Sequence, residues 1–373
     1  MIISEIKAYP LLLPMKTSFA ISGGTVGDPQ AGAPHVYVKI TGDNGVEGWG
    51  ECRPSHRWSY ETQESAVSAI RQYLAPVLIG RPVGDLQTIR RLMDREIAGS
   101  LHPGQPIAKA AVDMALHDLA AKSLRTSLPQ LWMAPARPTT RLSYLISTRD
   151  PEVAAEKART AVEEGYTGVD VKIGFDPRRD IEIVEAVKAT APQLFFRVDA
   201  NQGYDAIQAL RMCRELSRLG ADLFEQPLPA GDWEGHAALR RRSDVPIALD
   251  ESVWTPRDVI RAIRLEACDA IVIKLTKMGG LTGARLCGEI ASAAGLALVG
   301  GGLTESRLGL AASCHLFNGL GIETPVDLNG PLFLADDPVE TGPTIRRGSA
   351  ELPGGLGIGC MISQDKLEWF LSE

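Results

Sequence analysis

The chain has 373 residues, of which 45% are hydrophobic and 23% are charged, and its formal net charge is −7. This balance is typical of a globular protein with more than one domain, and the acidic excess disfavours partners such as nucleic acid or an anionic membrane surface. No apolar run reaches the ~18 residues of a membrane-spanning helix, and six scattered cysteines without a paired spacing favour a reduced, cytoplasmic location.

The first third of the chain has the pattern of a small α+β domain. Met1–Tyr9 alternates like a strand and lacks the basic start and the cleavage site of a signal peptide. Asn44-Gly45 favours a hairpin turn, whereas the Gly-rich segment Ser18–Ala33 shows no helical or strand period and is typical of a functional lid or a disordered loop. Periodicity predicts strands at Ile2–Leu13, Pro34–Ile40 and Val46–Glu51 and helices at Thr62–Leu78, Leu86–Ile97 and Ile107–Ala121. We therefore expect a domain over residues 1–135, ended by a Pro-containing linker.

From Thr140 onward, short apolar runs alternate with amphipathic segments, which predicts repeated βα units. The predicted strands are Leu142–Ser147, Gly168–Ile173, Leu194–Asp199, Leu223–Glu225, Ile247–Asp250, Ala270–Lys274, Leu296–Gly300 and Ile322–Asp327. The predicted helices are Glu152–Glu164, Arg179–Thr190, Ala206–Leu219, Glu234–Arg241, Pro256–Leu265, Thr282–Ala294 and Ser306–Phe317. The fold class expected for residues 136–329 is therefore α/β, a modified TIM barrel of the (β/α)7β type with its site at the carboxyl ends of the strands. The Gly/Pro-rich residues 330–373 are expected to return to the N-terminal domain.

Four consecutive predicted strands end in a charged residue. The spacings from Asp199 to Glu225, Asp250 and Lys274 in turn are 26, 25 and 24 residues, the length of one βα unit. Parallel strands place these ends at one rim, where three carboxylates would repel one another unless a cation lay between them. Mg²⁺ prefers oxygen ligands of this kind, with Mn²⁺ as an alternative. Each acid could instead cap the helix that follows it, but three acids at nearly equal spacing favour the metal site.

Five motifs occur in the same order as in the enolase superfamily, and the chain resembles its muconate lactonizing enzyme subgroup. These motifs are Val171–Gly174, Asp199–Asn201, Glu225–Pro227, Asp250–Ser252 and Lys274–Gly280, with Gly48–Glu51 in the opening hairpin. The resemblance implies that residues 1–135 form a capping domain and that the chain forms a homo-oligomer. It also implies that Asp199, Glu225 and Asp250 bind Mg²⁺, and that Lys172 and Lys274 are acid/base groups on opposite faces of a carboxylate substrate.

The chemistry of such a site follows from the acidity of its substrate. A proton alpha to a carboxylate is very weakly acidic, and its removal builds up an enediolate whose charge a metal ion can stabilise. A lysine that removes the proton must be partly neutral near pH 7, and a nearby cation together with a low-dielectric environment lowers its pKa. The two lysines are expected to face each other across the barrel mouth.

Three departures from the subgroup pattern narrow the function. Asp170 stands where most members have a second lysine, so Lys172 is expected to start as the acid and Lys274 as the base. The run Leu296–Gly301 contains no histidine, which disfavours sugar-acid dehydration. Asp327–Asn329 is similar to the Asp-x-Asp with which dipeptide epimerases hold an ammonium group, but its second acid is an amide, which weakens that assignment.

Substrate contacts are expected from the capping loops and from the last two strands. The capping loops are similar to those of members that act on hydroxyproline and its betaine, although packing explains their aromatic residues equally well. Glu305 matches a glutamate common in the subgroup, and it could also act as a helix N-terminal acid. The expected substrate-binding residues are Phe19, His56, Trp58, Tyr60, Glu305, Asp327 and Asn329, and the expected supporting residues are Asp170, Asn201 and Glu251.

Three functions are compatible with this pattern. The leading hypothesis is a Mg²⁺-dependent racemase or epimerase of a small carboxylate such as an amino-acid derivative. The first alternative uses the same enolate for muconate-type cycloisomerization or hydroxyproline dehydration. The second alternative, a non-catalytic barrel that only binds a ligand, is disfavoured because the three acids and both lysines are present.

Overall fold

The computed structural model describes residues 1–100 and 103–372, apart from the side chains of Phe19 and Ser372. The chain begins with an antiparallel sheet of strand order β1-β4-β5. Gly45 has φ +77° between β4 and β5, a conformation that glycine adopts without a steric cost. This sheet confirms the predicted antiparallel strands and the Asn44-Gly45 hairpin, and its strands are β1 (Ile3–Leu13), β4 (Ala33–Gly42) and β5 (Glu47–Cys52).

Helices cover one face of this sheet. The central helix is α4 (Pro106–Ser123), which packs on β5. Its first turn is capped by a residue that precedes the helix, because the Glu61 carboxylate accepts hydrogen bonds from the backbone N–H groups of Ile107 (2.7 Å) and Ala108 (2.9 Å). The smaller helical elements are α1 (Gln63–Ser68), a π-helical turn at Ala69–Leu74, α2 (Ala75–Leu78), α3 (Leu86–Glu96) and α5 (Leu128–Leu131).

Glycine permits the close approach of α4 to β5. A Cβ atom on Gly50 would lie 2.1 Å from the carbonyl oxygen of Ala111, so any side chain there must push the helix away from the sheet. We expect Gly50→Ala to lower the free energy of unfolding by about 2–4 kcal/mol because the core around α4 must open. Chemical denaturation checks this, with Gly84→Ala as the control, since nothing lies within 4 Å of a Cβ atom at Gly84. Equal stability of both variants would contradict the close packing.

The segment between the first two long strands is not a structureless loop, and the prediction for it was wrong. It contains a short hairpin of β2 (Phe19–Ile21) and β3 (Gly24–Gly27). The strands are only three and four residues long and rich in glycine, so they carry no sequence period. Hydrogen bonds from Ser22 Oγ to the Asn201 carbonyl (2.5 Å) and from Ser147 Oγ to the Ala20 carbonyl (2.7 Å) hold the hairpin against the barrel.

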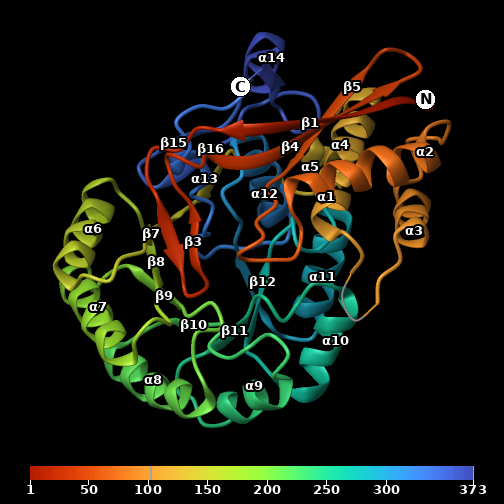
Figure 1. Ribbon diagram of the computed structural model, residues 1–373. Coiled ribbons are helices and arrows are strands. Elements are labelled where there is room, and N and C mark those ends of the chain that lie inside the picture. The colour runs from red at the N-terminus through yellow and green to blue at the C-terminus, as the bar shows by residue number, and fades with distance from the viewer. Residues whose placement is uncertain (101–102, 373) are drawn as a thin grey trace.

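Seven parallel strands follow in sequence order, and their helices form an arc around them (Figure 1). The strands are β7 (Ser143–Ile146), β8 (Gly168–Lys172), β9 (Phe195–Asp199), β10 (Leu223–Glu225), β11 (Ile247–Leu249), β12 (Ala270–Ile273) and β13 (Ala297–Gly300). The helices are α6 (Pro151–Glu163), α7 (Pro177–Thr190), α8 (Ala206–Leu219), α9 (Trp233–Arg240), α10 (Pro256–Leu265), α11 (Leu281–Ala293) and α12 (Arg307–Gly319). This confirms the predicted barrel with an α+β N-terminal domain.

The eighth strand is shorter than predicted. Val326 and Asp327 form parallel bridges to Leu142 and Gly301, and these bridges link the two ends of the seven-stranded sheet. Pro325 precedes this pair and has no backbone N–H to donate, which limits the strand to its last two residues.

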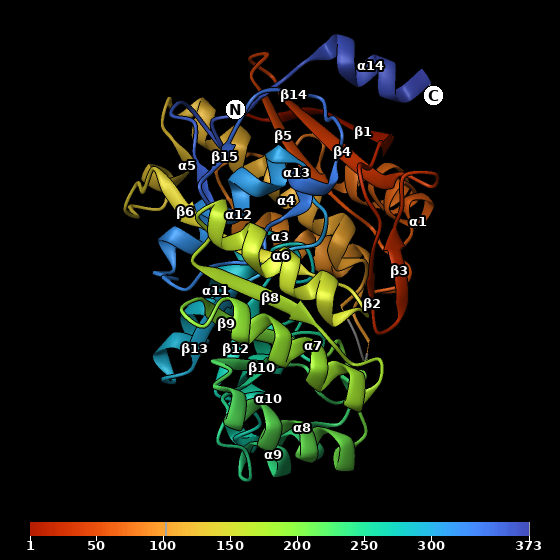
Figure 2. The same ribbon diagram turned by 90° about the vertical axis from the view of Figure 1, so that its left-hand side faces the viewer.

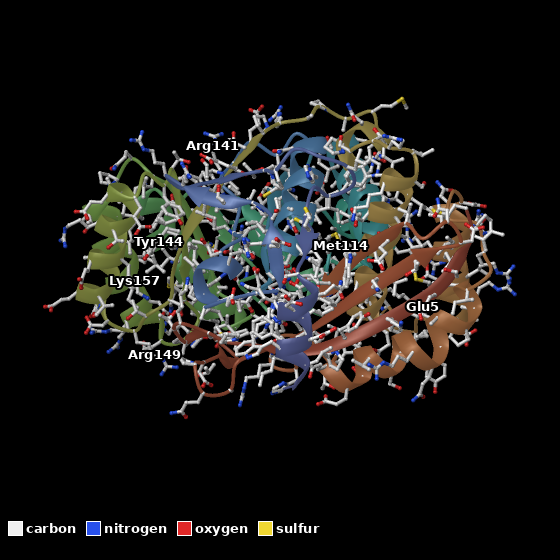
Figure 3. The ribbon with its side chains drawn as sticks, turned by 90° about the horizontal axis from the view of Figure 1, so that it is seen from above. Glu5, Met114, Arg141, Tyr144, Arg149 and Lys157 are labelled. Atoms are coloured by element: carbon white, nitrogen blue, oxygen red, sulfur yellow. The ribbon has the colours of Figure 1, made fainter. Side chains whose placement is uncertain are left out.

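The C-terminal segment contacts both parts of the molecule. Helix α14 (Gln364–Ser372) packs on β1 (Figure 2), and Figure 3 shows the blue C-terminal segment between the barrel and the N-terminal sheet, which carries Glu5. Strands β15 and β16 extend a small sheet that begins with β6. The remaining elements are β6 (Thr139–Arg141), α13 (Gly330–Phe333), β14 (Val339–Thr341), β15 (Thr344–Arg346), β16 (Ser349–Glu351) and β17 (Met361–Ile362).

The composition of the chain led to expectations about membrane-spanning helices and about the cysteines. Within residues 1–100 and 103–372, no helix is both long enough and apolar enough to cross a membrane. All six cysteines are buried as free thiols, and both Cys314 and His315 lie in the core, where His315 Nε2 lies 3.1 Å from the Ile358 carbonyl oxygen.

Candidate active site

Three neighbouring strands bring the three predicted ligands to one rim of the barrel. Asp199 is paired with Lys172 on one side and with Glu225 on the other, and Asp250 directly follows the next strand, β11. All three carboxylates are fully buried. The helices that follow are capped by other side chains, namely Asp205 for α8, Asp232 for α9 and Thr255 for α10. Helix capping therefore does not explain the three acids.

Lys172 is surrounded by carboxylates. Its Nζ lies 2.9 Å from Asp170 Oδ2, 2.7 Å from Asp199 Oδ2 and 3.4 Å from Asp327 Oδ2. Burial lowers the pKa of Lys172, but the attraction of these carboxylates outweighs it and holds the pKa well above its ordinary value. Asn329 supports this cluster because its Nδ2 donates to Asp327 Oδ1 at 2.8 Å.

Lys274 lies on the other side of the same rim. Its Nζ is 2.6 Å from Asp250 Oδ2, and a second buried lysine, Lys277, lies 2.7 Å from Asp250 Oδ1. Burial lowers the pKa of Lys274, but attraction chiefly to Asp250 and Glu225 raises it overall. Burial would likewise raise the pKa of Asp250, yet the two ammonium groups hold it well below its usual range.

The barrel interior contains a fully buried guanidinium that we did not predict. Arg197 Nε forms an ion pair with Glu225 Oε2, and Arg197 Nη1 donates to the Gly300 carbonyl at 3.0 Å. Its Nε also lies 3.9 Å from Asp170 Oδ2, so one cation joins a supporting acid to a predicted ligand. The sequence could have indicated this arginine. Side chains two residues apart in a strand point to the same face, so Arg197 must point inward together with Asp199.

The residues of this rim fit a divalent cation in donor chemistry and in charge. Glu225 Oε1 and Glu251 Oε2 are buried without a hydrogen-bond partner, although Asn201 Nδ2 donates to Glu251 Oε1 at 3.1 Å. Burial raises the pKa of Glu225 to about 7 and that of Glu251 to about 8, and a nearby positive charge would favour their ionised forms. When ionised, the six buried carboxylates exceed the four buried cations by two charges, which one divalent ion would balance. The carboxylates are Asp170, Asp199, Glu225, Asp250, Glu251 and Asp327, and the cations are Lys172, Arg197, Lys274 and Lys277.

The carboxylates are nevertheless not arranged as a finished coordination shell. In the described part of the chain, no three Asp, Glu, His or Cys side chains converge on one point as metal ligands would. The physical reason is visible in the contacts: Asp199, Glu225 and Asp250 each direct an oxygen to a lysine or arginine.

A small cavity opens beside these groups and receives both lysines. Its volume is about 40 Å³, and since one water needs roughly 10–15 Å³ on this scale, it holds on the order of three or four waters. Trp58 closes one side, with its ring 4.9 Å from Lys274 Nζ and 5.4 Å from the ring of Trp254. The lining residues are Ile21, Val26, Trp58, Leu145, Lys172, Asn201, Lys274, Gly302, Leu303, Thr304, Asp327, Asn329, Gly330 and Phe333.

Three other residues expected to bind substrate are not among the residues that line this cavity, namely His56, Tyr60 and Glu305. His56 is exposed, and Tyr60 stacks on Trp254 at 6.1 Å between centroids, behind Trp58. Glu305 is buried, and its Oε2 accepts a hydrogen bond from the Leu303 N–H at 2.7 Å. The backbone of Phe19 lies in β2, but its side chain is outside the described part of the structure.

The apolar wall was not foreseen from the sequence. Ile21, Val26, Leu145 and Phe333 come from the β2–β3 hairpin, the first barrel strand and the C-terminal segment. Single apolar residues so far apart in the chain form no sequence pattern that would predict their contact. Lys277 was visible as the fourth residue of the Lys274–Gly280 motif, but its contact with Asp250 depends on the loop geometry.

A buried hydrogen-bond chain joins the N-terminal sheet to the loop that carries Glu305. Tyr37 OH is bonded to Ser306 Oγ, Ser306 Oγ lies 2.7 Å from Glu51 Oε2, and the Gly309 N–H donates to Glu51 Oε1 at 2.6 Å. Burial raises the pKa of Glu51 to about 8. The protonated form is thus favoured in the folded protein.

This shift makes stability depend on pH with a definite sign. Between about pH 4.3, the ordinary pKa of an unfolded glutamate, and about pH 8, the folded state binds more protons at Glu51 than the unfolded state. The contribution of Glu51 is therefore complete below this window and is lost as the pH rises through it, by up to about 1.4 kcal/mol per pH unit. We expect Glu51→Gln to flatten this decline in denaturation curves measured at pH 5, 6.5 and 8. Parallel pH profiles of the two proteins would refute it.

Comparison with known proteins gives two matching family models, one for each part of the chain. The model described as "Enolase C-terminal domain-like" matches residues 153–366, and the model described as "Mandelate racemase / muconate lactonizing enzyme, N-terminal domain" matches residues 7–132.

Individual relatives have several activities. The N-succinyl-L-Arg/Lys racemase of Bacillus cereus is 32% identical over 90% of this chain and 89% of the racemase, and muconate cycloisomerase 1 of Rhodococcus opacus is 33% identical over 90% of each chain. The crystal structure of a dipeptide epimerase from Cytophaga hutchinsonii, complexed with Mg and the dipeptide D-Ala-L-Val, is 29% identical with a TM-score of 0.92 and covers 99% of this chain and 98% of that chain. Similar proteins thus share the fold and differ in substrate.

Proposed function

Because the chain belongs to the mandelate racemase/muconate lactonizing enzyme family of the enolase superfamily, we propose that it removes the proton alpha to a carboxylate with Mg²⁺ as cofactor, and that it racemizes or epimerizes a small amino-acid derivative. Its relatives are isomerases, named as racemases, epimerases and cycloisomerases. The substrate and the metal are the proposed parts.

One observation carries the proposal: two lysine amino groups enter one small cavity from different sides of the barrel. Lys172 ends β8 and Lys274 follows β12, and three strands lie between β8 and β12 in the sheet. A substrate pinned between them would present one face to each amino group. Removal of a proton on one face and its return on the other inverts the alpha carbon.

The roles of the other groups follow from their positions. Asp199, Glu225 and Asp250 would hold the divalent ion, which as a Lewis acid would stabilise the charge that develops on the substrate carboxylate. Lys274 would act as base toward one face, and Lys172, kept cationic by Asp170, would return a proton to the other. The apolar part of the wall limits contact with bulk water and lowers the local dielectric, which strengthens each of these interactions.

The lining of the cavity suits a small carboxylate, because two cationic amino groups stand beside apolar side chains. In addition, both oxygens of Asp327 already have partners, Lys172 and Asn329. A dipeptide ammonium group would have to share an oxygen with one of these partners or displace it.

A second candidate function rests on the surroundings of Lys172. Three carboxylates within 3.4 Å would keep this lysine permanently charged. Among the described residues Lys274 forms an ion pair with Asp250 alone, and a cation bound at Asp250 would offset that attraction, so that only Lys274 could remove a proton. One-base chemistry of this kind suits syn dehydration of a hydroxyproline or muconate-type cycloisomerization. We favour epimerization because Lys172 lines the cavity and can reach the substrate.

Incubation with candidate acids in deuterated buffer with Mg²⁺ tests the proposal. Proline-sized amino acids, their N-methylated betaines, dipeptides and muconates are followed by NMR and chiral chromatography. Deuterium incorporation with inversion supports epimerization, whereas loss of water or lactone formation supports the second candidate. No exchange with any carboxylate would favour a non-catalytic binding barrel. Light scattering on the same sample tests the proposed homo-oligomer.

A further inference from the structure

Two lysines of one loop hold the two oxygens of Asp250. Lys274 Nζ lies 2.6 Å from Oδ2, while Lys277 Nζ lies 2.7 Å from Oδ1 and donates a second hydrogen bond to the Asp250 carbonyl oxygen at 2.6 Å. Both side chains are buried, with 4% and 0% exposure respectively. A metal ion that binds Asp250 must therefore either share an oxygen with one of these ammonium groups, against their charge, or displace that group.

The two lysines are not equivalent. Lys277 lies outside the cavity wall and binds both the carboxylate and the backbone of the same residue, which fixes the orientation of the Asp250 side chain. Lys274 has one hydrogen bond to Asp250 and faces the cavity, where the ring of Trp58 at 4.9 Å offers its ammonium group a second favourable contact. Displacement from Asp250 thus costs less for Lys274 than for Lys277.

We infer that Lys277 is a positioning residue that presents Asp250 Oδ2 to a divalent cation, and that Lys274 competes with this cation for the same oxygen. The inference rests on the proposed function, which places the cation at Asp199, Glu225 and Asp250. It predicts that Lys277 strengthens and Lys274 weakens the binding of the cation to the same carboxylate. Simple charge repulsion would instead give both lysines the same effect, because removal of either would strengthen cation binding.

Mg²⁺ titration calorimetry on the full-length protein distinguishes these cases. Lys277→Met frees the Asp250 side chain to rotate, and we expect Mg²⁺ affinity to fall by about tenfold or more, as is typical when a partner that orients a metal ligand is lost. Lys274→Met removes the competitor, and we expect affinity to rise severalfold. Lys188→Met, on α7, removes a lysine outside the rim and should leave the affinity unchanged.

The outcomes separate this inference from the proposed function. If wild type binds Mg²⁺ and both rim variants shift in the same direction, the positioning role is overturned while the metal site stands. If wild type and all variants fail to bind Mg²⁺, both are overturned. Should Lys277→Met not fold, Lys277→Gln takes its place, because its amide can still donate to the Asp250 carbonyl. Weaker binding by Lys277→Gln supports the inference, and unchanged or tighter binding overturns it.

Discussion

Replacing Asp199, Glu225 or Asp250 by its amide is expected to weaken Mg²⁺ binding by on the order of 100-fold or more. Each substitution keeps the shape of the side chain and removes the negative charge that a hard cation requires. The loss should exceed the 10–100-fold typical of residues that only orient a ligand. Titration calorimetry measures the affinity, and loss of deuterium exchange should accompany it.

Two of these variants are also expected to lose stability. Glu225→Gln leaves the buried Arg197 with only the more distant Asp170 as an ion-pair partner, and Asp250→Asn leaves Lys274 and Lys277 as buried cations without their carboxylate. Each of these two variants should therefore lose about 3–5 kcal/mol of folding free energy. Asp258→Asn is the matched control, because Asp258 follows the same strand as Asp250 but accepts hydrogen bonds in the first turn of α10. It should cost about 1 kcal/mol of stability and leave Mg²⁺ affinity intact. Unchanged Mg²⁺ affinity in all three amide variants would refute the metal assignment.

The sequence predicted the barrel because its signals are local. Each strand is a short apolar run next to an amphipathic helix, and a charged residue at the end of a parallel strand must lie at the common rim. Asp199, Glu225, Asp250 and Lys274 were therefore placed together from their spacing, and the structure does place them there. Their roles came from the family resemblance and remain proposals.

What escaped prediction depends on contacts between distant segments. The β2–β3 hairpin has strands too short for a period, and its position depends on Ser22 and Ser147 bonding across the domain boundary. The partners of Arg197 and Lys277 depend on barrel closure and on loop geometry. The size of the cavity is likewise a property of side chains from several elements, so the sequence could suggest the reaction class but not the dimensions of the substrate.

The largest stereochemical effect is expected from the two lysines. Lys172→Ala should abolish alpha-proton exchange for one enantiomer of a racemizable substrate, and Lys274→Ala should abolish it for the other, each by about 10²- to 10⁴-fold. Each amino group can reach only the hydrogen on its own side of a substrate held at the rim. Either variant therefore still exchanges the enantiomer that its remaining lysine faces, although neither completes the inversion. Deuterium incorporation into each pure enantiomer, followed by NMR, measures both effects.

Asp170 could change the result of these lysine substitutions. Its carboxylate lies 2.9 Å from Lys172 Nζ, and if it keeps that lysine permanently charged, Lys274→Ala will abolish exchange for both enantiomers while Lys172→Ala weakens substrate binding alone. That pattern would identify a one-base catalyst and make dehydration or cycloisomerization the better assignment. Asp170→Asn then provides the control, because loss of the acid should lower the pKa of Lys172 and partly restore exchange on its face. Full turnover of both enantiomers by either alanine variant would contradict both mechanisms, since no other lysine lines the described cavity.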